Sequence, residues 1–110
     1  LAVLDARMDQ VYVAAYEYAQ GTWQCVQEAA LHRPEALTWP AHWHHGTPFM
    51  AAGNAWHTYA QRWPAHFTAA QVQALPSAAA LLRLAPQAWA DGLAVPAEQA
   101  LPLYIRDKVP

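Results

Sequence analysis

Hydrophobic and polar residues alternate along the first third of the chain, and this pattern predicts a group of antiparallel strands. In residues 11–18 the side chains repeat with a period of two, as in a strand with one buried face. Residues 1–4 form a similar run, and the small and charged residues 5–9 between the two runs predict a chain reversal. The turn signal at residues 20–21 then predicts a third antiparallel strand over residues 23–31.

The middle of the chain predicts shorter elements. Proline and glutamate suit the first turn of a helix, so residues 34–39 are expected to be helical until Pro40. Residues 47–52 form a brief apolar run, which favours a buried strand. Apolar side chains within residues 56–63 fall at helical spacing and predict an amphipathic helix that ends at Pro64.

The last third predicts one longer helix and an extended tail. Residues 65–75 are weakly patterned and are expected to form a loop with a turn of helix. Ser77 is a good N-cap, and the apolar stripe within residues 78–89 that follows it ends at Gly92. Pro86 is expected to kink this helix or to divide it in two. The prolines after the helix predict an extended tail.

The predicted elements run in the order strand, strand, strand, helix, strand, helix, then a longer helix and the tail. This order belongs to the α+β class and permits several arrangements. Trp56 and Trp89 each lie on an apolar helical stripe. Both are therefore expected in the core, where replacement by alanine costs about 3 kcal/mol or more.

The composition indicates one small domain with little surface charge. The chain has 110 residues and a mass of 12.2 kDa, which allows a single core. Charged residues make up 13% of it, about half the usual share, so part of the surface is expected to face another protein. There is no initial methionine, no signal peptide and no apolar run long enough to cross a bilayer. We therefore expect a soluble, cytoplasmic piece of a longer protein without membrane contact.

Charge and cysteine content exclude further classes. The net charge is −2 with six Lys and Arg, so the basic surface of a domain that grips phosphates is missing and direct nucleic-acid binding is not expected. Cys25 is the single cysteine, which excludes an internal disulfide and fits a reducing compartment. It lies in a strand-like run without a basic neighbour, so we expect a buried, structural thiol. Ser77 is better explained as a helix cap than as a nucleophile.

Six histidines suggest a metal site. On a strand, His42 and His44 would share one face, and two imidazoles with a third ligand can hold zinc. His45 belongs to the same cluster. However, the sequence has no His-Glu-x-x-His motif, and no carboxylate lies between Glu35 and Asp91. The histidines are therefore expected to be structural or exposed, with no bound metal.

Two short segments near the ends of the chain resemble a known family. They are residues 4–12, Leu-Asp-Ala-Arg-Met-Asp-Gln-Val-Tyr, and residues 102–106, Pro-Leu-Tyr-Ile-Arg. Both resemble the TsaB family, also called YeaZ. The resemblance covers the whole chain but only the second half of such a protein. The candidate interface or structural residues of this motif are Asp5, Arg7, Asp9, Tyr12, Tyr104 and Arg106.

The resemblance implies a fold and a role. Residues 1–110 would form the single C-terminal lobe of a two-lobe protein, a ribonuclease-H-like lobe of an actin-like fold. Such a protein is a non-catalytic subunit of the bacterial complex that makes threonylcarbamoyladenosine at adenosine 37 of transfer RNA. Its partners are a TsaD-like catalytic subunit and a TsaE-like ATPase. In the family these contacts are attributed mainly to the N-terminal lobe, and no catalytic residue, metal or cofactor is implied here.

The opening hairpin raises the possibility of a nucleotide contact. In actin-like folds such a hairpin commonly holds nucleotide phosphate through glycine-rich backbone. Residues 5–9 contain no glycine and two carboxylates, which repel phosphate unless a metal intervenes. We expect Asp5 and Arg7 to fix the hairpin and the lobe interface, with a nucleotide contact as the alternative. Arg106 is expected to pair with Asp5 or Asp9.

Other functions stay open from the sequence. One is a metal-dependent, glycoprotease-like peptidase that uses the histidine cluster, and another is a free-standing protein-interaction module. Few charged residues and a high apolar content predict that apolar surface is left to be covered. We therefore expect a homodimer of this chain, with the opening hairpin and residues 103–106 at a two-fold interface.

Overall fold

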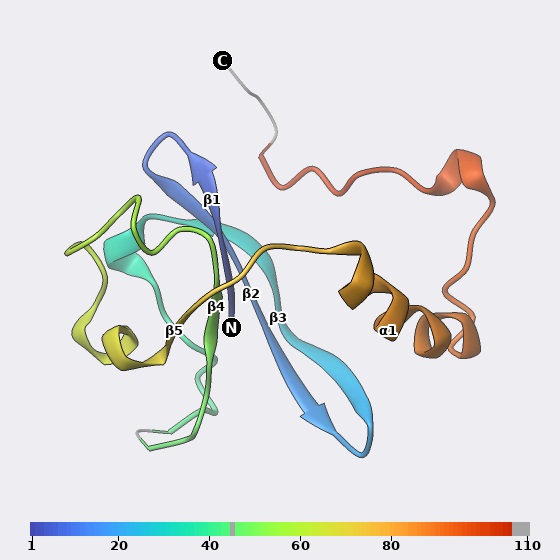
Figure 1. Cartoon of the computed structure of the whole chain (residues 1–110), viewed down its shortest axis with the longest axis horizontal. Coiled ribbons are helices and arrows are strands. Elements are labelled where there is room, and N and C mark those ends of the chain that lie inside the picture. The colour runs from blue at the N-terminus through green and yellow to red at the C-terminus, as the bar shows by residue number, and fades with distance from the viewer. Residues whose placement is uncertain (45, 107–110) are drawn as a thin grey trace. The chain divides into compact units, whose positions relative to one another are not determined.

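Five strands form one mixed sheet in the first of two units of the chain (Figure 1). The computed structural model describes residues 1–44 and 46–106. The first unit is Leu1–Leu75, and the second begins at Pro76. The strands are β1 (Ala2–Arg7), β2 (Gln10–Ala19), β3 (Thr22–His32), β4 (Ala51–Gly53) and β5 (Gln71–Gln73).

The sheet combines antiparallel and parallel pairs in the order β3-β2-β1-β4-β5. β2 lies antiparallel to both β1 and β3, so the predicted group of three antiparallel strands is confirmed. β4 runs parallel to β1 on its other side, and β5 runs parallel to β4. Two crossover segments therefore make the connections in this half of the sheet. Residues 33–50 connect β3 to β4, and residues 54–70 connect β4 to β5. Most of the residues discussed below lie on these two segments.

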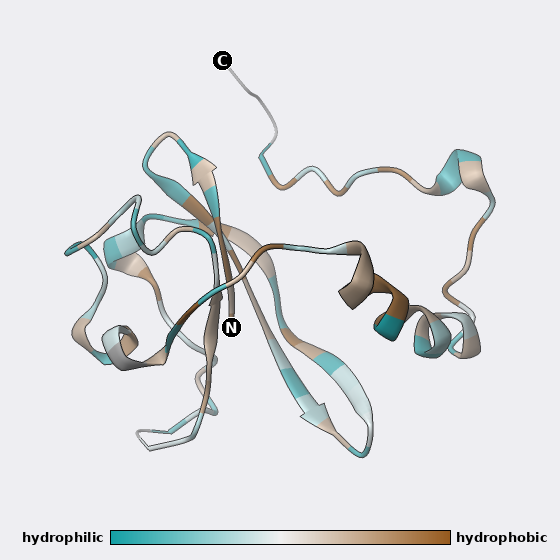
Figure 2. Cartoon of the chain, viewed as in Figure 1, coloured by the Kyte–Doolittle hydropathy of each residue, from teal (hydrophilic) through white to brown (hydrophobic). Residues whose placement is uncertain are grey.

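The main core lies where these crossover segments pack on the sheet. Val3, Val11 and Val13 of β1 and β2 are fully buried, as the alternating pattern predicts. Leu37 and Phe67 come from the two crossovers and join the same cluster. Figure 2 shows the hydrophobic colouring of β1 and β4 in the middle of the sheet.

Gly53 is the point of closest approach between β4 and β1. It lies opposite Val3 in the parallel register. A Cβ atom built on Gly53 would overlap the carbonyl oxygen of Val3, so only glycine fits there. The strand that the sequence places at residues 47–52 is therefore shifted, because the chain pairs with β1 only over Ala51–Gly53.

The predicted helices of the first unit are largely replaced by turns. Only Pro34–Ala36 of the first is helical, as a short 3-10 helix. The amphipathic helix expected in residues 56–63 is absent from the described structure, which has successive turns there. Gln61 has a φ of 68°, a left-handed conformation that a continuing α-helix excludes. Trp56 and Tyr59 of this segment are buried, whereas Trp63 is partly buried and Ala60 is exposed, so the periodicity marked two core positions but not their backbone.

The second crossover ends in regular structure that the sequence did not predict. Residues 65–75 were expected to be mostly loop. Instead Ala65–Ala70 forms a 3-10 helix and leads directly into β5. The turn of helix expected in this segment is confirmed, whereas the strand is a correction, because three residues are too few to show a period of two.

The second unit contains one α-helix, α1 (Ala78–Ala90), and a 3-10 helix, Ala97–Gln99. Ser77 caps α1, since its side-chain oxygen accepts a hydrogen bond from the backbone N–H of Ala80 at 3.1 Å. Pro86 lies inside the helix without dividing it. Gly92 follows the C-cap with a φ of 73°, as predicted for a terminating glycine.

The apolar stripe of α1 is exposed, which corrects the expectation that it belongs to the core. Trp89 is 76% exposed, and Leu81 and Leu82 are 65% and 74% exposed. Figure 2 shows the strongly hydrophobic part of this helix. Periodicity defines such a stripe but does not specify what covers it. Within the described residues, the structure has no helix long and apolar enough to span a membrane.

Candidate functional site

The turn between β1 and β2 holds three consecutive residues in the left-handed conformation. Arg7, Met8 and Asp9 have φ values of 60°, 56° and 63°. This region disfavours residues other than glycine, asparagine and aspartate, so the surrounding contacts must hold the turn in place. One such contact is local, because the backbone N–H of Arg7 donates to Oδ1 of Asp5 at 2.9 Å.

Asp5 also joins the hairpin to the segment that follows β4. The hydroxyl of Tyr59 donates to Oδ1 of Asp5 at 2.8 Å, and the backbone N–H of Asp5 donates to Oδ1 of Asn54 at 2.8 Å. Tyr59 is only 7% exposed. Burial, followed by the hydrogen bond to Asp5, raises the pKa of Tyr59 above its usual value, so its hydroxyl stays protonated and acts as a donor.

Asp9 is held by an ion-pair network that includes residues of both crossover segments. Nη1 of Arg62 lies 2.7 Å from Oδ1 of Asp9, and Nη2 of Arg62 lies 3.0 Å from Oε2 of Glu35. Arg33 adds a contact of 3.2 Å from its Nε to Oε1 of Glu35. The hydrogen bond to Asp9 raises the pKa of Arg62, and the pKa of Glu35 is lowered first by its own backbone N–H and then by Arg33.

These contacts determine what the hairpin can do chemically. Both carboxylates already accept hydrogen bonds from the protein, and the N–H of Arg7 is used by Asp5. A phosphate cradle needs converging backbone donors and positive charge. The hairpin instead presents carboxylates and strained backbone, so its geometry fits a structural clamp better than a nucleotide contact.

The histidine cluster lies on a loop rather than on a strand. Nε2 of His42 lies 2.5 Å from Oε2 of Glu17, and Nε1 of Trp43 donates to the same oxygen at 2.8 Å. The hydrogen bonds from Trp43 and then His42 lower the pKa of Glu17. The sequence around the histidines contains no carboxylate, but the fold brings Glu17 of β2 next to His42 from a distant part of the chain. His45 lies outside the described residues.

Neither a metal-binding cluster nor a buried thiol is found among the described residues. Among residues 1–44 and 46–106, the structure has no group of three or more His, Cys, Asp or Glu side chains that could hold a metal ion. The absence of bound metal remains a prediction. Cys25 is exposed on β3, which corrects the expected burial, and its Sγ lies 3.4 Å from the carbonyl oxygen of Gln27.

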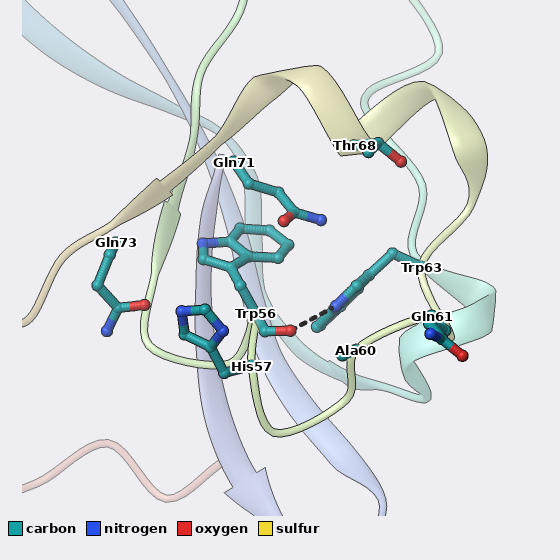
Figure 3. A pocket seen from close by; sticks show the side chains of 8 residues that line it. All are labelled: Trp56, His57, Ala60, Gln61, Trp63, Thr68, Gln71 and Gln73. Atoms are coloured by element: carbon teal, nitrogen blue, oxygen red, sulfur yellow. Dashed lines mark hydrogen bonds between the residues drawn. The ribbon is translucent and has the colours of Figure 1, made fainter.

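A pocket of about 420 Å³ opens beside the second crossover (Figure 3). Its walls come from three parts of the first unit, namely the turns after β4, the 3-10 helix Ala65–Ala70 and the edge strand β5. The lining residues are Trp56, His57, Ala60, Gln61, Trp63, Thr68, Gln71 and Gln73. Because the walls come from separate segments, no motif in the sequence indicates the pocket.

Two tryptophans form the rigid part of this pocket. Nε1 of Trp56 donates to the carbonyl oxygen of Val72 at 3.0 Å, and Nε1 of Trp63 donates to the carbonyl oxygen of Trp56 at 3.2 Å. Their ring centroids lie 4.7 Å apart with an interplanar angle of 61°, an edge-to-face contact. The second of these hydrogen bonds is drawn in Figure 3. The pocket therefore has fixed indole walls and a polar rim of amides, one hydroxyl and one imidazole.

Solved structures of other proteins resemble this chain in fold and in sequence. YeaZ from Pseudomonas aeruginosa is 40% identical over 94% of this chain, with a TM-score of 0.80. The chain belongs to the YeaZ family. A second structure, described as an uncharacterized protein with similarity to peptidase YeaZ from Pseudomonas aeruginosa, is 37% identical over 96% of this chain with a TM-score of 0.76. Neither a protein-family model nor a curated protein sequence matches the chain.

The chain spans about half the length of these YeaZ structures. It covers 47% of the first and 48% of the second. The recognition made from the two terminal segments is thus confirmed. The activity and partners of a whole YeaZ protein are matters of proposal for this chain.

The structure brings together only some of the residues of the YeaZ motif. Asp5 and Asp9 belong to the hairpin clamp, whereas Tyr12 lies on β2 between Leu4 and Leu31 of the neighbouring strands. Tyr104 is exposed and Arg106 is partly buried, both in the second unit. The expected pairing of Arg106 with Asp5 or Asp9 remains a prediction.

The residues that hold the clamp are not among those that the sequence indicates. Tyr59 belongs to the apolar side chains that predict a helix within residues 56–63, and nothing in the sequence links it, Arg62 or Glu35 to the hairpin. Arg62 is separated from Asp9 by 53 residues, and Tyr59 from Asp5 by 54. The one signal in the sequence that points to these partners is the small number of cationic residues. With only six Lys and Arg in the chain, few residues can form an ion pair with Asp9.

Proposed function

We propose that this chain is the C-terminal lobe of a non-catalytic YeaZ-type subunit, also called TsaB. Such a subunit supports a TsaD-like catalytic partner, together with a TsaE-like ATPase, in modifying adenosine 37 of transfer RNA. The observation that carries the proposal is the 40% identity to YeaZ over 94% of the chain. The role in tRNA modification follows from membership of the family, and it implies a cytoplasmic location.

The strand topology supports the fold part of this proposal. An antiparallel group, β1 to β3, is extended on the β1 side by two parallel strands. A ribonuclease-H-like lobe of an actin-like protein combines antiparallel and parallel strands in this way. The lobe assignment for residues 1–110 is part of the proposal.

The hairpin clamp supports a non-catalytic role. In the lobe of an ATP-binding relative the same hairpin would offer backbone donors to phosphate, whereas here Asp5 and Asp9 already accept bonds from Tyr59 and Arg62. The contacts therefore favour a rigid support over a nucleotide site. Transfer-RNA contact would then come mainly from the partner subunits, since this chain has only six Lys and Arg.

The competing proposal is a metal-dependent peptidase. It draws on the word peptidase in the description of one similar structure, which is a statement about that protein. In the described part of this chain, His42 has one carboxylate neighbour, Glu17, and no third metal ligand accompanies them. A peptidase assay with and without added zinc separates the two proposals directly.

A chimera tests the proposed function. The part of Pseudomonas aeruginosa YeaZ that this chain matches is replaced by the chain itself, and the chimera is expressed in bacteria depleted of their own YeaZ. Threonylcarbamoyladenosine in digested transfer RNA is measured by mass spectrometry. We expect the chimera to restore the modified nucleoside and to co-purify with TsaD.

Two control variants separate folding from function in this test. Gln24→Ala changes an exposed side chain of β3 and should leave the modification unchanged. Trp56→Ala removes a buried core side chain and should abolish it through unfolding. A soluble, folded chimera that gives no modified nucleoside would contradict the proposal.

A further inference from the structure

We propose that the pocket beside Trp56 and Trp63 binds an uncharged heteroaromatic ring of the nucleobase class. The pocket lies wholly within the first unit, and neither the hairpin clamp nor the histidine loop contributes to it. At about 420 Å³ it is large enough for one fused ring system and falls in the lower range of small-molecule sites. The proposal does not depend on the role in tRNA modification.

The first argument is that the aromatic walls are fixed before any ligand binds. Both indole N–H groups are already used, by the carbonyl oxygens of Val72 and Trp56. The two rings also contact each other edge to face at 4.7 Å. Trp56 is only 5% exposed and mainly supports Trp63, whose partly exposed ring offers apolar surface rather than a hydrogen bond. Because this ring is already held in place, no rotamer freedom has to be lost there on binding. Such surface suits a flat ring.

The second argument is that the polar groups of the rim are available. Gln61, Gln71 and Gln73 all line the pocket, and in the described residues none of their amide groups has a protein hydrogen-bond partner. A glutamine amide presents a donor next to an acceptor, which matches a base edge that carries an amino group beside a ring nitrogen. Figure 3 shows the Gln71 amide close to the Trp56 indole, from which it can reach the edge of a ring held against that wall.

The third argument concerns charge. None of the lining residues is Lys, Arg, Asp or Glu. A phosphate, a carboxylate or an ammonium group would lose water there without gaining an opposite charge, which is unfavourable. The ligand is therefore uncharged at the pocket. A neutral sugar shares this property, but indole walls and planar amides favour stacking and edge recognition of a base.

The test uses adenosine as the probe and the side-chain amide signals of the protein as the readout. Adenosine is titrated into the ¹⁵N-labelled chain while two-dimensional NMR spectra are recorded. We expect saturable shifts of the Gln71 amide. N6,N6-dimethyladenosine lacks the amino donor and should bind about fivefold more weakly, as expected for one lost hydrogen bond. Adenosine monophosphate should bind no more tightly than adenosine, and methyl glucoside should cause no saturable shift.

Three variants locate the binding. Gln71→Ala should weaken adenosine binding about fivefold. Ala60→Trp places a large side chain at an exposed lining position, so it should block the pocket without disturbing the core. Gln24→Ala removes the same kind of side chain from exposed β3 and should leave binding unchanged. Circular dichroism confirms that each variant keeps its fold.

Several results would overturn the proposal. One is the absence of saturable shifts up to about 10 mM adenosine, since that limit corresponds to binding weaker than about 3 kcal/mol. Another is binding that Gln71→Ala and Ala60→Trp both leave unchanged, because adenosine would then sit elsewhere. Equal binding of methyl glucoside would assign the pocket to sugars.

Discussion

Replacing Trp56 by alanine should unfold or strongly destabilise the first unit. The indole is 5% exposed, donates to the carbonyl oxygen of Val72 on β5 and contacts Trp63 edge to face. It therefore joins the second crossover to the edge of the sheet. Trp63 is held by a hydrogen bond to the backbone carbonyl of Trp56, so we expect it not to move into the space that alanine would leave.

The magnitude follows from the buried area. A tryptophan side chain buries about 150–250 Å², worth about 4–6 kcal/mol at about 25 cal/mol per Å². Residual burial in the unfolded chain lowers this by about 10–40%. The lost ring contact and the remaining cavity raise it again. We expect a loss of about 3–5 kcal/mol in the free energy of unfolding, which is a large part of the stability of a small domain.

Guanidinium unfolding followed by far-ultraviolet circular dichroism measures this loss, and Trp89→Ala provides the matched control. Trp89 has the same side chain and a similar helical stripe in the sequence, but it is 76% exposed. Its replacement should cost less than about 1 kcal/mol. Equal effects of the two substitutions would refute the reasoning, since burial would then not decide the cost.

Four further predictions address individual contacts. Glu17 has a lowered pKa, so its contribution to stability is complete above its usual pKa of 4.5 and is lost as the pH falls below that value. In Glu17→Gln the free energy of unfolding should therefore depend less on pH between about pH 3 and 5, and an unchanged pH dependence would contradict this. Tyr59→Phe removes the donor to Asp5 and should cost about 1 kcal/mol in chemical unfolding, whereas Tyr16→Phe on the exposed part of β2 should cost nothing. Calorimetry should detect no stoichiometric zinc at sub-micromolar affinity, and zinc binding lost on replacing His42 and His44 would disprove this. Light scattering across a dilution series should show a homodimer, because large apolar side chains of α1 are exposed, and a monomer up to about hundreds of micromolar would rule it out.

The strands of the first unit could be predicted because each carries its own signal. In β2, Val11 and Val13 point into the core while Tyr12 between them is only partly buried, so a period of two is written directly in the sequence. The cap at Ser77 is equally local, since the residue contacts an N–H three positions away. The segment after β4 has the pattern of a helix in its sequence, because Trp56, Tyr59 and Trp63 fall at helical spacing and the first two are buried. Its backbone nevertheless forms turns, with Gln61 in the left-handed region.

The clamp at the opening hairpin could not be predicted, because its bonds join distant segments. The motif correctly drew attention to Asp5 and Asp9, but nothing in the residues around them names Tyr59 or Arg62 as partners. Long-range pairing depends on the register of β1 with β4, and that register depends on the close approach at Gly53. This close approach helps to place the segment after β4, which carries Tyr59 and Arg62, beside the hairpin.

The pocket, like the clamp, is formed by segments that no local sequence pattern connects. Its amides come from three glutamines that form no sequence motif. Gln61 lies in the turns after β4, and Gln71 and Gln73 lie on β5, which follows the 3-10 helix directly. Gln71 and Gln73 are two positions apart on β5 and therefore share a face of the strand, which Trp56 anchors through its hydrogen bond to Val72. Moving β5 by one residue would turn both amides away and bring Val72 into the pocket. The register of this three-residue strand therefore determines whether Gln71 and Gln73 contribute to the polar rim, and the Gln71 amide signal in the adenosine titration is sensitive to that register as well as to the ligand.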